Sequence, residues 1–66
     1  MQVTVNGKPE SFHDEMSVSD LLARLKIEPI RVAVEINEDI IPRKTFAGRV
    51  IRDGDRIEIV TFVGGG

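Results

Sequence analysis

Alternating apolar and polar positions open the chain and predict a β-hairpin. Residues 2–5 read Gln-Val-Thr-Val, and the extended pattern resumes from Lys8 to His13 around Phe12. Strand residues that face a core recur at every second position, which is the period seen here. Asn6 and Gly7 separate the two runs, and both tolerate the positive φ angles of a two-residue hairpin turn.

A helical period follows and predicts one amphipathic helix over residues 18–26. Its apolar residues recur at i, i+3, i+4 and i+7, which places them on a single face. Ser17 has the side chain of a helix N-cap, and Asp20 stands three residues later, as in a capping box. Pro29 prevents the helix from continuing. The apolar stripe consists of Val18, Leu21, Leu22 and Leu25.

The β period returns in the second half of the chain. Alternation over residues 31–36 predicts a half-buried strand, which residues 37–39 turn toward a short strand that Pro42 ends. Residues 43–52 have no clear period and are expected to form an irregular segment that packs Phe46 inward. After an Asp-Gly-Asp turn, the run from Arg56 to Val63 has the highest β propensity and is expected to be a central strand.

These elements predict one α+β domain. A helix with a single apolar stripe must cover one face of a mixed sheet. Pairing the last strand in parallel beside the first places the helix in the connection between them. The expected fold is the ubiquitin-like β-grasp, with a mixed sheet of four to five strands and one main helix on one face. We expect the domain to cover residues 1–63 and residues 64–66 to form a flexible C-terminal glycine tail.

The parity of the last strand predicts an exposed apolar patch. If Ile57 and Ile59 face the helix, Val60 and Phe62 point to the open face of the sheet, where water is expected. One hypothesis is that these two side chains dock a partner that also takes the tail. The alternative is that residues 43–52 cover the open face or that Phe62 wraps around the end of the sheet.

Size and composition exclude several classes of function. A chain of 66 residues has no room for a deep catalytic cleft between two lobes, so we expect a protein that is not an enzyme. With no Cys and a single His, neither a thiolate nucleophile nor a metal site is expected. The Asp-Gly-Asp turn lacks the further ligands of a calcium loop, and the sequence places no nucleophile near His13.

Charge and targeting signals narrow the choice of partners. The formal net charge is −2 and there is no Trp or Tyr, which argues against nucleic acid as a partner. No signal peptide or membrane-spanning run is visible, so we expect a cytoplasmic protein, monomeric alone and without a membrane partner. A loose basic run is expected to be a solvated face or to meet acidic residues of a partner; it consists of Arg43, Arg49, Arg52 and Arg56.

Glycine is concentrated at the end of the chain. Three of the six glycines are Gly64, Gly65 and Gly66, which cannot add to a core. Extended, they reach roughly 10 Å, and without a Cβ they fit a narrow channel in another protein. The terminal carboxylate is ionised at pH 7 and is a poor electrophile, so chemistry there requires activation, such as adenylation. The alternative is a disordered end or an engineered addition.

Four features occur together in this chain: an expected strand from the start at Met1, residues 33–43, which read Ala-Val-Glu-Ile-Asn-Glu-Asp-Ile-Ile-Pro-Arg, the turn at residues 53–57, and the final Gly65 and Gly66. This combination resembles the ThiS family of sulfur carriers. The resemblance covers the whole chain. Two positions depart from the family pattern, because Phe46 stands where members often have Trp and Gly64 where another residue often precedes the terminal pair.

The resemblance implies a carrier without a permanently bound cofactor. Its Gly66 would be adenylated with ATP by an E1-like enzyme of the ThiF type and then converted to a thiocarboxylate. A donor protein would supply the sulfur, which would pass to a thiazole synthase of the ThiG type in thiamine biosynthesis. Three alternatives stay open: a carrier for molybdopterin synthesis or tRNA thiolation, a ubiquitin-like protein modifier, and a ligand-binding or RNA-binding module with an idle tail.

Overall fold

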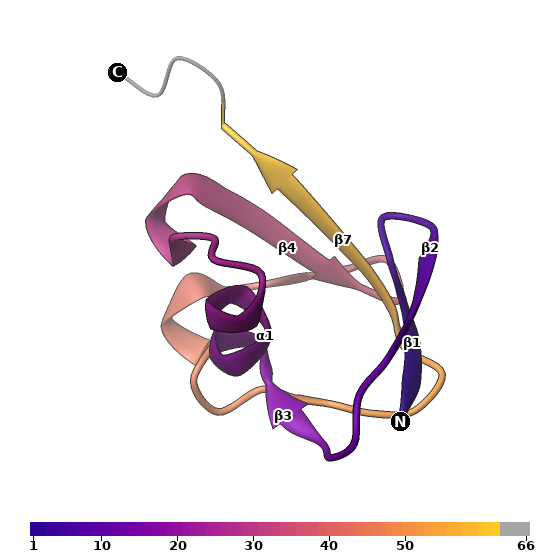
Figure 1. The fold of residues 1–66 in the computed structure, drawn as a ribbon. Helices are drawn as coiled ribbons and strands as arrows, with labels where there is room; N and C mark the ends of the chain where they lie inside the picture. The colour runs from indigo at the N-terminus through magenta and orange to yellow at the C-terminus, as the bar shows by residue number, and fades with distance from the viewer. Residues whose placement is uncertain (63–66) are drawn as a thin grey trace.

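The computed structural model describes residues 1–62 and shows a five-stranded mixed sheet with a helix across one face (Figure 1). The strand order is β2-β1-β7-β4-β5. The last strand, β7, lies in the centre, in parallel with β1 and antiparallel to β4. The predicted β-grasp arrangement is therefore present. The strands of this sheet are β1 (Gln2–Val5), β2 (Lys8–Ser11), β4 (Val32–Ile36), β5 (Asp39–Ile41) and β7 (Arg56–Thr61).

Two tight turns join the outer strands in hairpins. Asn6 and Gly7 have φ angles of 52° and 80° between β1 and β2. Asn37 and Glu38 have φ angles of 53° and 73° between β4 and β5. Positive φ at both central residues is the geometry that matches the right-handed twist of paired strands. The first hairpin is confirmed, although β2 ends at Ser11 and not at His13 as predicted.

The helix α1 (Val18–Arg24) begins as the sequence predicts. The Ser17 side chain accepts a hydrogen bond from the backbone N–H of Asp20, and the Asp20 side chain accepts one from the backbone N–H of Ser17. This reciprocal pair is the capping box, and it satisfies two N–H groups at the start of the helix.

The end of α1 differs from the prediction, which extended the helix to Lys26. Lys26 adopts a φ of 60°, and its N–H donates to the Ala23 carbonyl, while the N–H of Ile27 donates to the Leu22 carbonyl. These two bonds form a Schellman motif, which ends a helix through one left-handed residue. The helix therefore stops before Pro29 can interrupt it.

The segment after β5 packs on the helix side of the sheet. It begins with a 3₁₀ turn, Arg43–Thr45, and continues to Phe46, which is only 3% exposed, as predicted. A two-stranded sheet that the sequence did not predict, β3 (Met16–Ser17) with β6 (Val50–Ile51), ties the segment to the start of α1.

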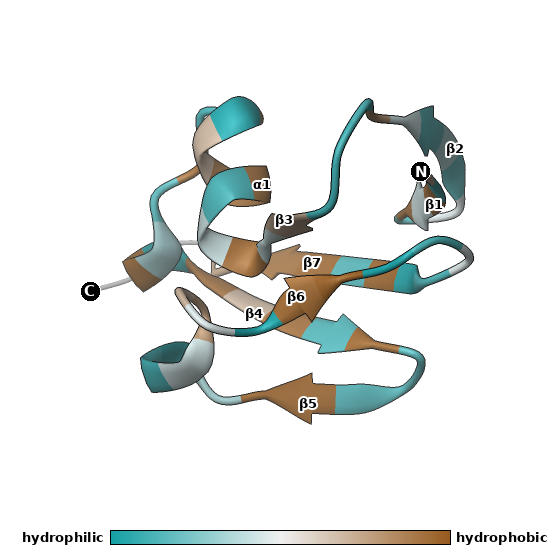
Figure 2. Ribbon diagram, turned by 90° about the horizontal axis from the view of Figure 1, so that it is seen from below, coloured by the Kyte–Doolittle hydropathy of each residue, from teal (hydrophilic) through white to brown (hydrophobic). Residues whose placement is uncertain are grey.

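The core lies between α1 and the sheet. Apolar and polar residues alternate along β4 and β7, as the bands in Figure 2 show. Within the described residues, no helix is long and apolar enough to cross a membrane. The buried apolar residues are Val3, Met16, Val18, Leu21, Leu22, Val32, Val34, Ile36, Ile41, Phe46, Ile51, Ile57 and Ile59.

Candidate functional site

The candidate site is the surface around the end of β7, from which the chain continues to its glycines. Gly64, Gly65 and Gly66 lie outside the described residues. Phe62 is the last described residue, and Figure 1 shows the end of β7 on the opposite side of the molecule from the N-terminus. The surroundings of Phe62 therefore define where the tail leaves the domain.

The open face of the sheet carries the predicted apolar pair. Ile57 and Ile59 are buried beneath the helix, so the alternate residues of β7 leave the sheet on the other side. Val60 is 57% exposed and Phe62 is 48% exposed. The prediction that these two side chains are exposed is confirmed; their role in docking stays a prediction.

Residues 43–52, which were considered as a cover for this face, do not lie on it in the described structure. The irregular segment packs on the opposite side, because the Phe46 carbonyl accepts a hydrogen bond from the Ser19 N–H of α1. The Arg49 carbonyl likewise accepts one from the Val18 N–H, at 2.9 Å. Both contacts hold the segment against the helix and leave the open face of β7 uncovered by it.

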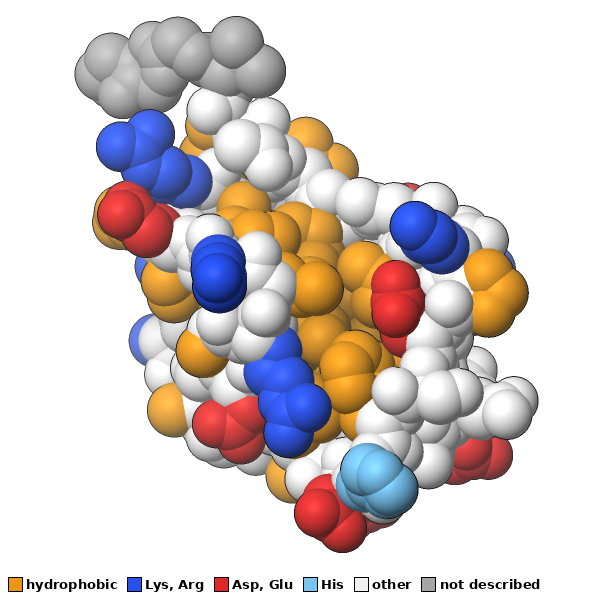
Figure 3. All heavy atoms as spheres, in the orientation of Figure 1, with side chains coloured by type: hydrophobic (Ala, Val, Ile, Leu, Met, Phe, Trp, Pro, Cys, Tyr) orange, Lys and Arg blue, Asp and Glu red, His pale blue; other side chains and the backbone are white. Residues whose placement is uncertain are grey.

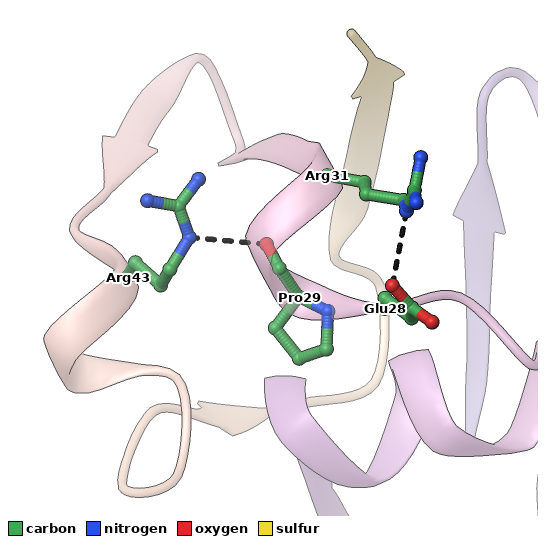
Figure 4. Close-up of polar contacts among 4 residues, drawn as sticks. All are labelled: Glu28, Pro29, Arg31 and Arg43. Carbon is green, nitrogen blue, oxygen red and sulfur yellow. Dashed lines mark hydrogen bonds and ion pairs between the residues drawn. The ribbon is translucent and has the colours of Figure 1, made fainter. Parts of the chain in front are cut away.

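A hydrogen bond at the end of β7 fixes the point at which the tail begins. The Phe62 N–H donates to the Arg31 carbonyl at 2.8 Å. Arg31 ends a 3₁₀ turn, Pro29–Arg31, that precedes β4. The Arg43 guanidinium holds this turn from the other side, because its Nε donates to the Pro29 carbonyl at 3.0 Å (Figure 4). Its Nη2 also donates to the Val32 carbonyl, at 3.1 Å.

Arg43 therefore has a role that the sequence did not indicate. Arg43 is exposed, as expected for a solvated basic run, but its guanidinium also bonds two carbonyl groups far from it in sequence. Arg49 also bonds a backbone carbonyl, that of Val50. The Ile-Pro-Arg stretch was visible in the family resemblance, but no local pattern shows which carbonyls an arginine reaches.

A charged rim surrounds a shallow depression beside the same turn. Arg31 pairs with Glu28 through Nε and Oε2 at 2.9 Å, with both side chains 68% exposed (Figure 4). An ion pair this exposed contributes little stability, because water screens it. The depression is lined by Lys26, Ile27, Glu28, Arg31 and Thr61.

Asn6 supports β7 from the opposite edge. Its side-chain amide accepts from the Ile59 N–H at 2.7 Å and donates to the Ile59 carbonyl at 3.2 Å. Since β1 pairs with β7 only as far as Val5 and Ile57, this amide continues the pairing by one further step. The sequence identified Asn6 as a turn residue but not as a partner of the central strand.

The carboxylates considered for metal binding form hydrogen bonds that hold neighbouring segments of the chain together. Asp53 accepts from the backbone N–H of Gln2, and Asp55 accepts from Arg52 N–H and the Asn37 side chain. The predicted turn is thus confirmed, and its carboxylates hold neighbouring segments. His13 is exposed in the loop after β2. Within residues 1–62, no group of three His, Cys, Asp or Glu is arranged to hold a metal ion.

A second apolar area lies on the helix side, between α1 and the β1–β2 hairpin (Figure 3). Half-buried side chains pack against the core there, including Val5, Phe12 and Leu25. The Arg24 guanidinium lies 5.9 Å from the centre of the Phe12 ring and partly covers it. The sequence did not predict this area.

Comparison with known proteins identifies the family. A sequence model of the ThiS family matches residues 3–66, nearly the whole chain. The chain belongs to the ThiS family. The match extends to the last residue and so covers the terminal glycines.

Individual relatives agree with this assignment. The sulfur carrier protein ThiS of Bacillus subtilis is 41% identical over 63 residues, which are 94% of this chain and 96% of that protein. A thiazole synthase of Paramagnetospirillum magneticum is also 41% identical, over 66 residues. This ThiS-family chain spans a fifth of the length of that synthase, since the match covers 20% of it.

A solved structure confirms the fold. The crystal structure of the thiamine biosynthesis protein ThiS from Geobacter metallireducens superposes with a TM-score of 0.86 at 38% identity, and the match covers 100% of both chains. The described residues thus share the ThiS fold, including the β-grasp sheet and its single main helix.

Proposed function

We propose that this ThiS-family protein is the sulfur carrier of thiamine biosynthesis and that the carboxylate of Gly66 carries the sulfur. The observation that supports the proposal most directly is the family match, which runs to the last residue. Full-length relatives named sulfur carrier protein support the same role. The protein is then a substrate of other enzymes and performs no catalysis itself.

The chemistry proceeds by activation of the terminal carboxylate. A carboxylate oxygen attacks the α-phosphorus of ATP, pyrophosphate leaves, and the product is an acyl-adenylate on Gly66. An E1-like enzyme of the ThiF type supplies this step. Hydrosulfide released by the donor then attacks the carbonyl carbon, AMP leaves, and Gly66 ends in a thiocarboxylate. Gly64 and Gly65 extend the reach of this end, and the absence of a Cβ leaves the reacting carbon unhindered.

The domain presents the tail and docks the enzyme. The central strand leads directly to the tail and is held on both sides, by the Arg31 carbonyl at Phe62 and by Asn6 at Ile59. We propose that Val60 and Phe62 contact the adenylating enzyme, because exposed apolar side chains at the base of the tail fit an interface core.

The sulfur is proposed to pass to a thiazole synthase of the ThiG type. A thiazole synthase that contains a matching stretch in its own chain supports this link. A donor protein supplies the sulfur, and ATP is consumed by the activating enzyme, so no cofactor is bound permanently. We place this chemistry in the cytoplasm and expect the free carrier to be a monomer.

Intact-mass spectrometry tests the carrier function. Incubation with ATP, the adenylating enzyme of the same organism and a sulfur donor is expected to increase the mass by the difference between one sulfur and one oxygen atom. Omission of ATP is the control and is expected to leave the mass unchanged. No mass change in the complete reaction would overturn the proposal, and isopeptide conjugates on lysines would indicate a protein modifier.

The proposed docking patch, which consists of Val60 and Phe62, is tested separately by the substitution Phe62→Asp. A carboxylate in place of an exposed ring is expected to weaken binding to the adenylating enzyme by at least tenfold, because it would be desolvated in an apolar contact. The melting temperature is expected to change little, since Phe62 lies outside the core. Exposed Ala47, in the segment that packs on the helix side of the sheet, gives the control Ala47→Asp. Equal affinity for Phe62→Asp and the natural protein would exclude this patch.

A further inference from the structure

Two glutamates lie directly opposite each other on the open face of the sheet. Glu35 of β4 and Glu58 of β7 are register partners in the antiparallel pair, so their side chains leave the sheet on the same side. Directly opposite residues have Cβ atoms about 5 Å apart, and like charges at such positions destabilise a sheet. The face therefore holds a repulsive pair that does not help the domain to fold.

No cation compensates this pair in the part of the chain that the structure describes. The ion pair recorded there joins Arg31 to Glu28, on another surface. Arg56 lies on the same face, two residues before Glu58, but forms no ion pair with either glutamate within residues 1–62. The two carboxylates thus rely on water for their solvation.

Apolar side chains stand on both sides of the pair. Val60 follows Glu58 along β7, and Ile40, which is 75% exposed, is the register partner of Glu35 in β5. A protein that covers Val60 and Ile40 also removes water from the two carboxylates between them. Buried charges without a partner are costly, so such a protein must bring positive charge to this position.

We propose that the open face fits an adenylating enzyme whose docking surface presents an arginine or lysine to Glu35 and Glu58, beside an apolar contact for Val60. The proposal rests on the carrier function proposed above and defines the chemistry of its first partner. In the free carrier the two carboxylates repel each other. In the complex a cation of the enzyme lies between the two carboxylates and attracts both of them. The same attraction increases the rate at which carrier and enzyme associate.

The test is the double variant Glu35→Gln/Glu58→Gln in the full chain. Its melting temperature is expected to rise by about 1–5 °C, because the repulsion is removed. Its affinity for the adenylating enzyme is expected to fall about tenfold at low salt, mainly through slower association. The loss should shrink at high salt, where screening weakens the electrostatic attraction in the natural complex.

The control is Asp14→Asn/Glu15→Gln, which removes the same charge from the exposed loop before β3. That loop lies at the far end of the molecule from the end of β7 (Figure 1). Both double variants change the formal net charge from −2 to 0. A general effect of net charge therefore moves both variants equally, whereas the proposed contact affects only the first.

A single charge reversal, Glu58→Lys, separates stability from binding. It creates an attractive cross-strand pair with Glu35, so the melting temperature is expected to rise further, while binding to the enzyme weakens more than in the glutamine variant. The charge proposal would be overturned if Glu35→Gln/Glu58→Gln and Glu58→Lys bound the enzyme with the same affinity as the loop control. If binding were then weakened only by Phe62→Asp, the proposed apolar contact would be supported and the charge proposal would be excluded.

Failure of the carrier function itself is distinguishable, because it shows in the mass of the natural protein. No sulfur incorporation into Gly66 would remove the basis of both proposals. Incorporation in the natural protein, with unchanged association rates in the glutamine variant, would overturn only the electrostatic one.

Discussion

Glu38 occupies a backbone conformation that its side chain disfavours. Its φ of 73° lies in the left-handed region, where residues with a Cβ are strained by roughly 1–2 kcal/mol. Gly7, in the equivalent position of the first hairpin, has a φ of 80° without that strain. The β4–β5 hairpin thus forms despite one unfavourable residue, because the strands that it joins are paired and packed.

The substitution Glu38→Gly is expected to stabilise the protein by roughly 0.5–1 kcal/mol, the relieved strain less the larger entropy of the unfolded chain. Urea denaturation measures the difference. The neighbouring substitution Asp39→Gly serves as the control, because Asp39 lies in β5 without a positive φ and glycine there is expected to destabilise. A loss of stability in both variants would contradict the strain argument.

Single residues also mark the limit of sequence analysis. Parity predicts the exposure of Val60 and Phe62, because side chains in a strand alternate by geometry alone. The left-handed Lys26 that ends α1 could not be predicted, since lysine gives no signal for that conformation. Asn6 was identified as a turn residue, but its bonds to Ile59 span 53 positions and depend on the assembled sheet.

At the level of elements, the loop before β4 is stabilised by a side chain from beyond β5. Arg43 bonds the carbonyls of Pro29 and Val32, and the turn between them supplies the Arg31 carbonyl that receives the Phe62 N–H. The end of β7 thus depends on a contact made by another element.

The substitution Arg43→Ala is expected to cost about 1 kcal/mol of stability, because two carbonyls lose a charged donor. It should also shift the amide resonance of Phe62 in an NMR spectrum. Lys44→Ala is the control, since Lys44 is an exposed neighbour in the same 3₁₀ turn. Equal changes in the two variants would show that the contact has no specific effect.

Elements with several periods of pattern were predictable, and the shortest ones were not. The helix start follows from its capping box and the central position of β7 from its run of β-branched residues. The strands β3 and β6 have two residues each, too few to display a period, and they exist because Met16 and Ile51 meet in the core. Their pairing became visible only with the tertiary structure.

At the scale of the whole molecule, we expect folding and sulfur carrying to reside in different parts of the chain. The buried core of the described residues runs from Val3 to Ile59. Deletion of residues 64–66 is therefore expected to leave the melting temperature within about 1 °C of the natural value, because it removes no core contact. The same deletion is expected to abolish thiocarboxylate formation in the mass assay. A marked loss of stability would show that the glycines belong to the folded domain.

Because β1 ends at Val5, the last residues of the central strand β7 lack a neighbouring strand on one side. Ile57 and Ile59 turn their peptide groups toward the β1 side, so by alternation Thr61 does too, and no described strand accompanies it there. Phe62, facing β4, is hydrogen-bonded to Arg31. Amide hydrogen exchange is expected to be faster at Thr61 than at Phe62. The described strand is thus paired along its whole length on one side only, and we expect it to fray first at the end that precedes the glycines.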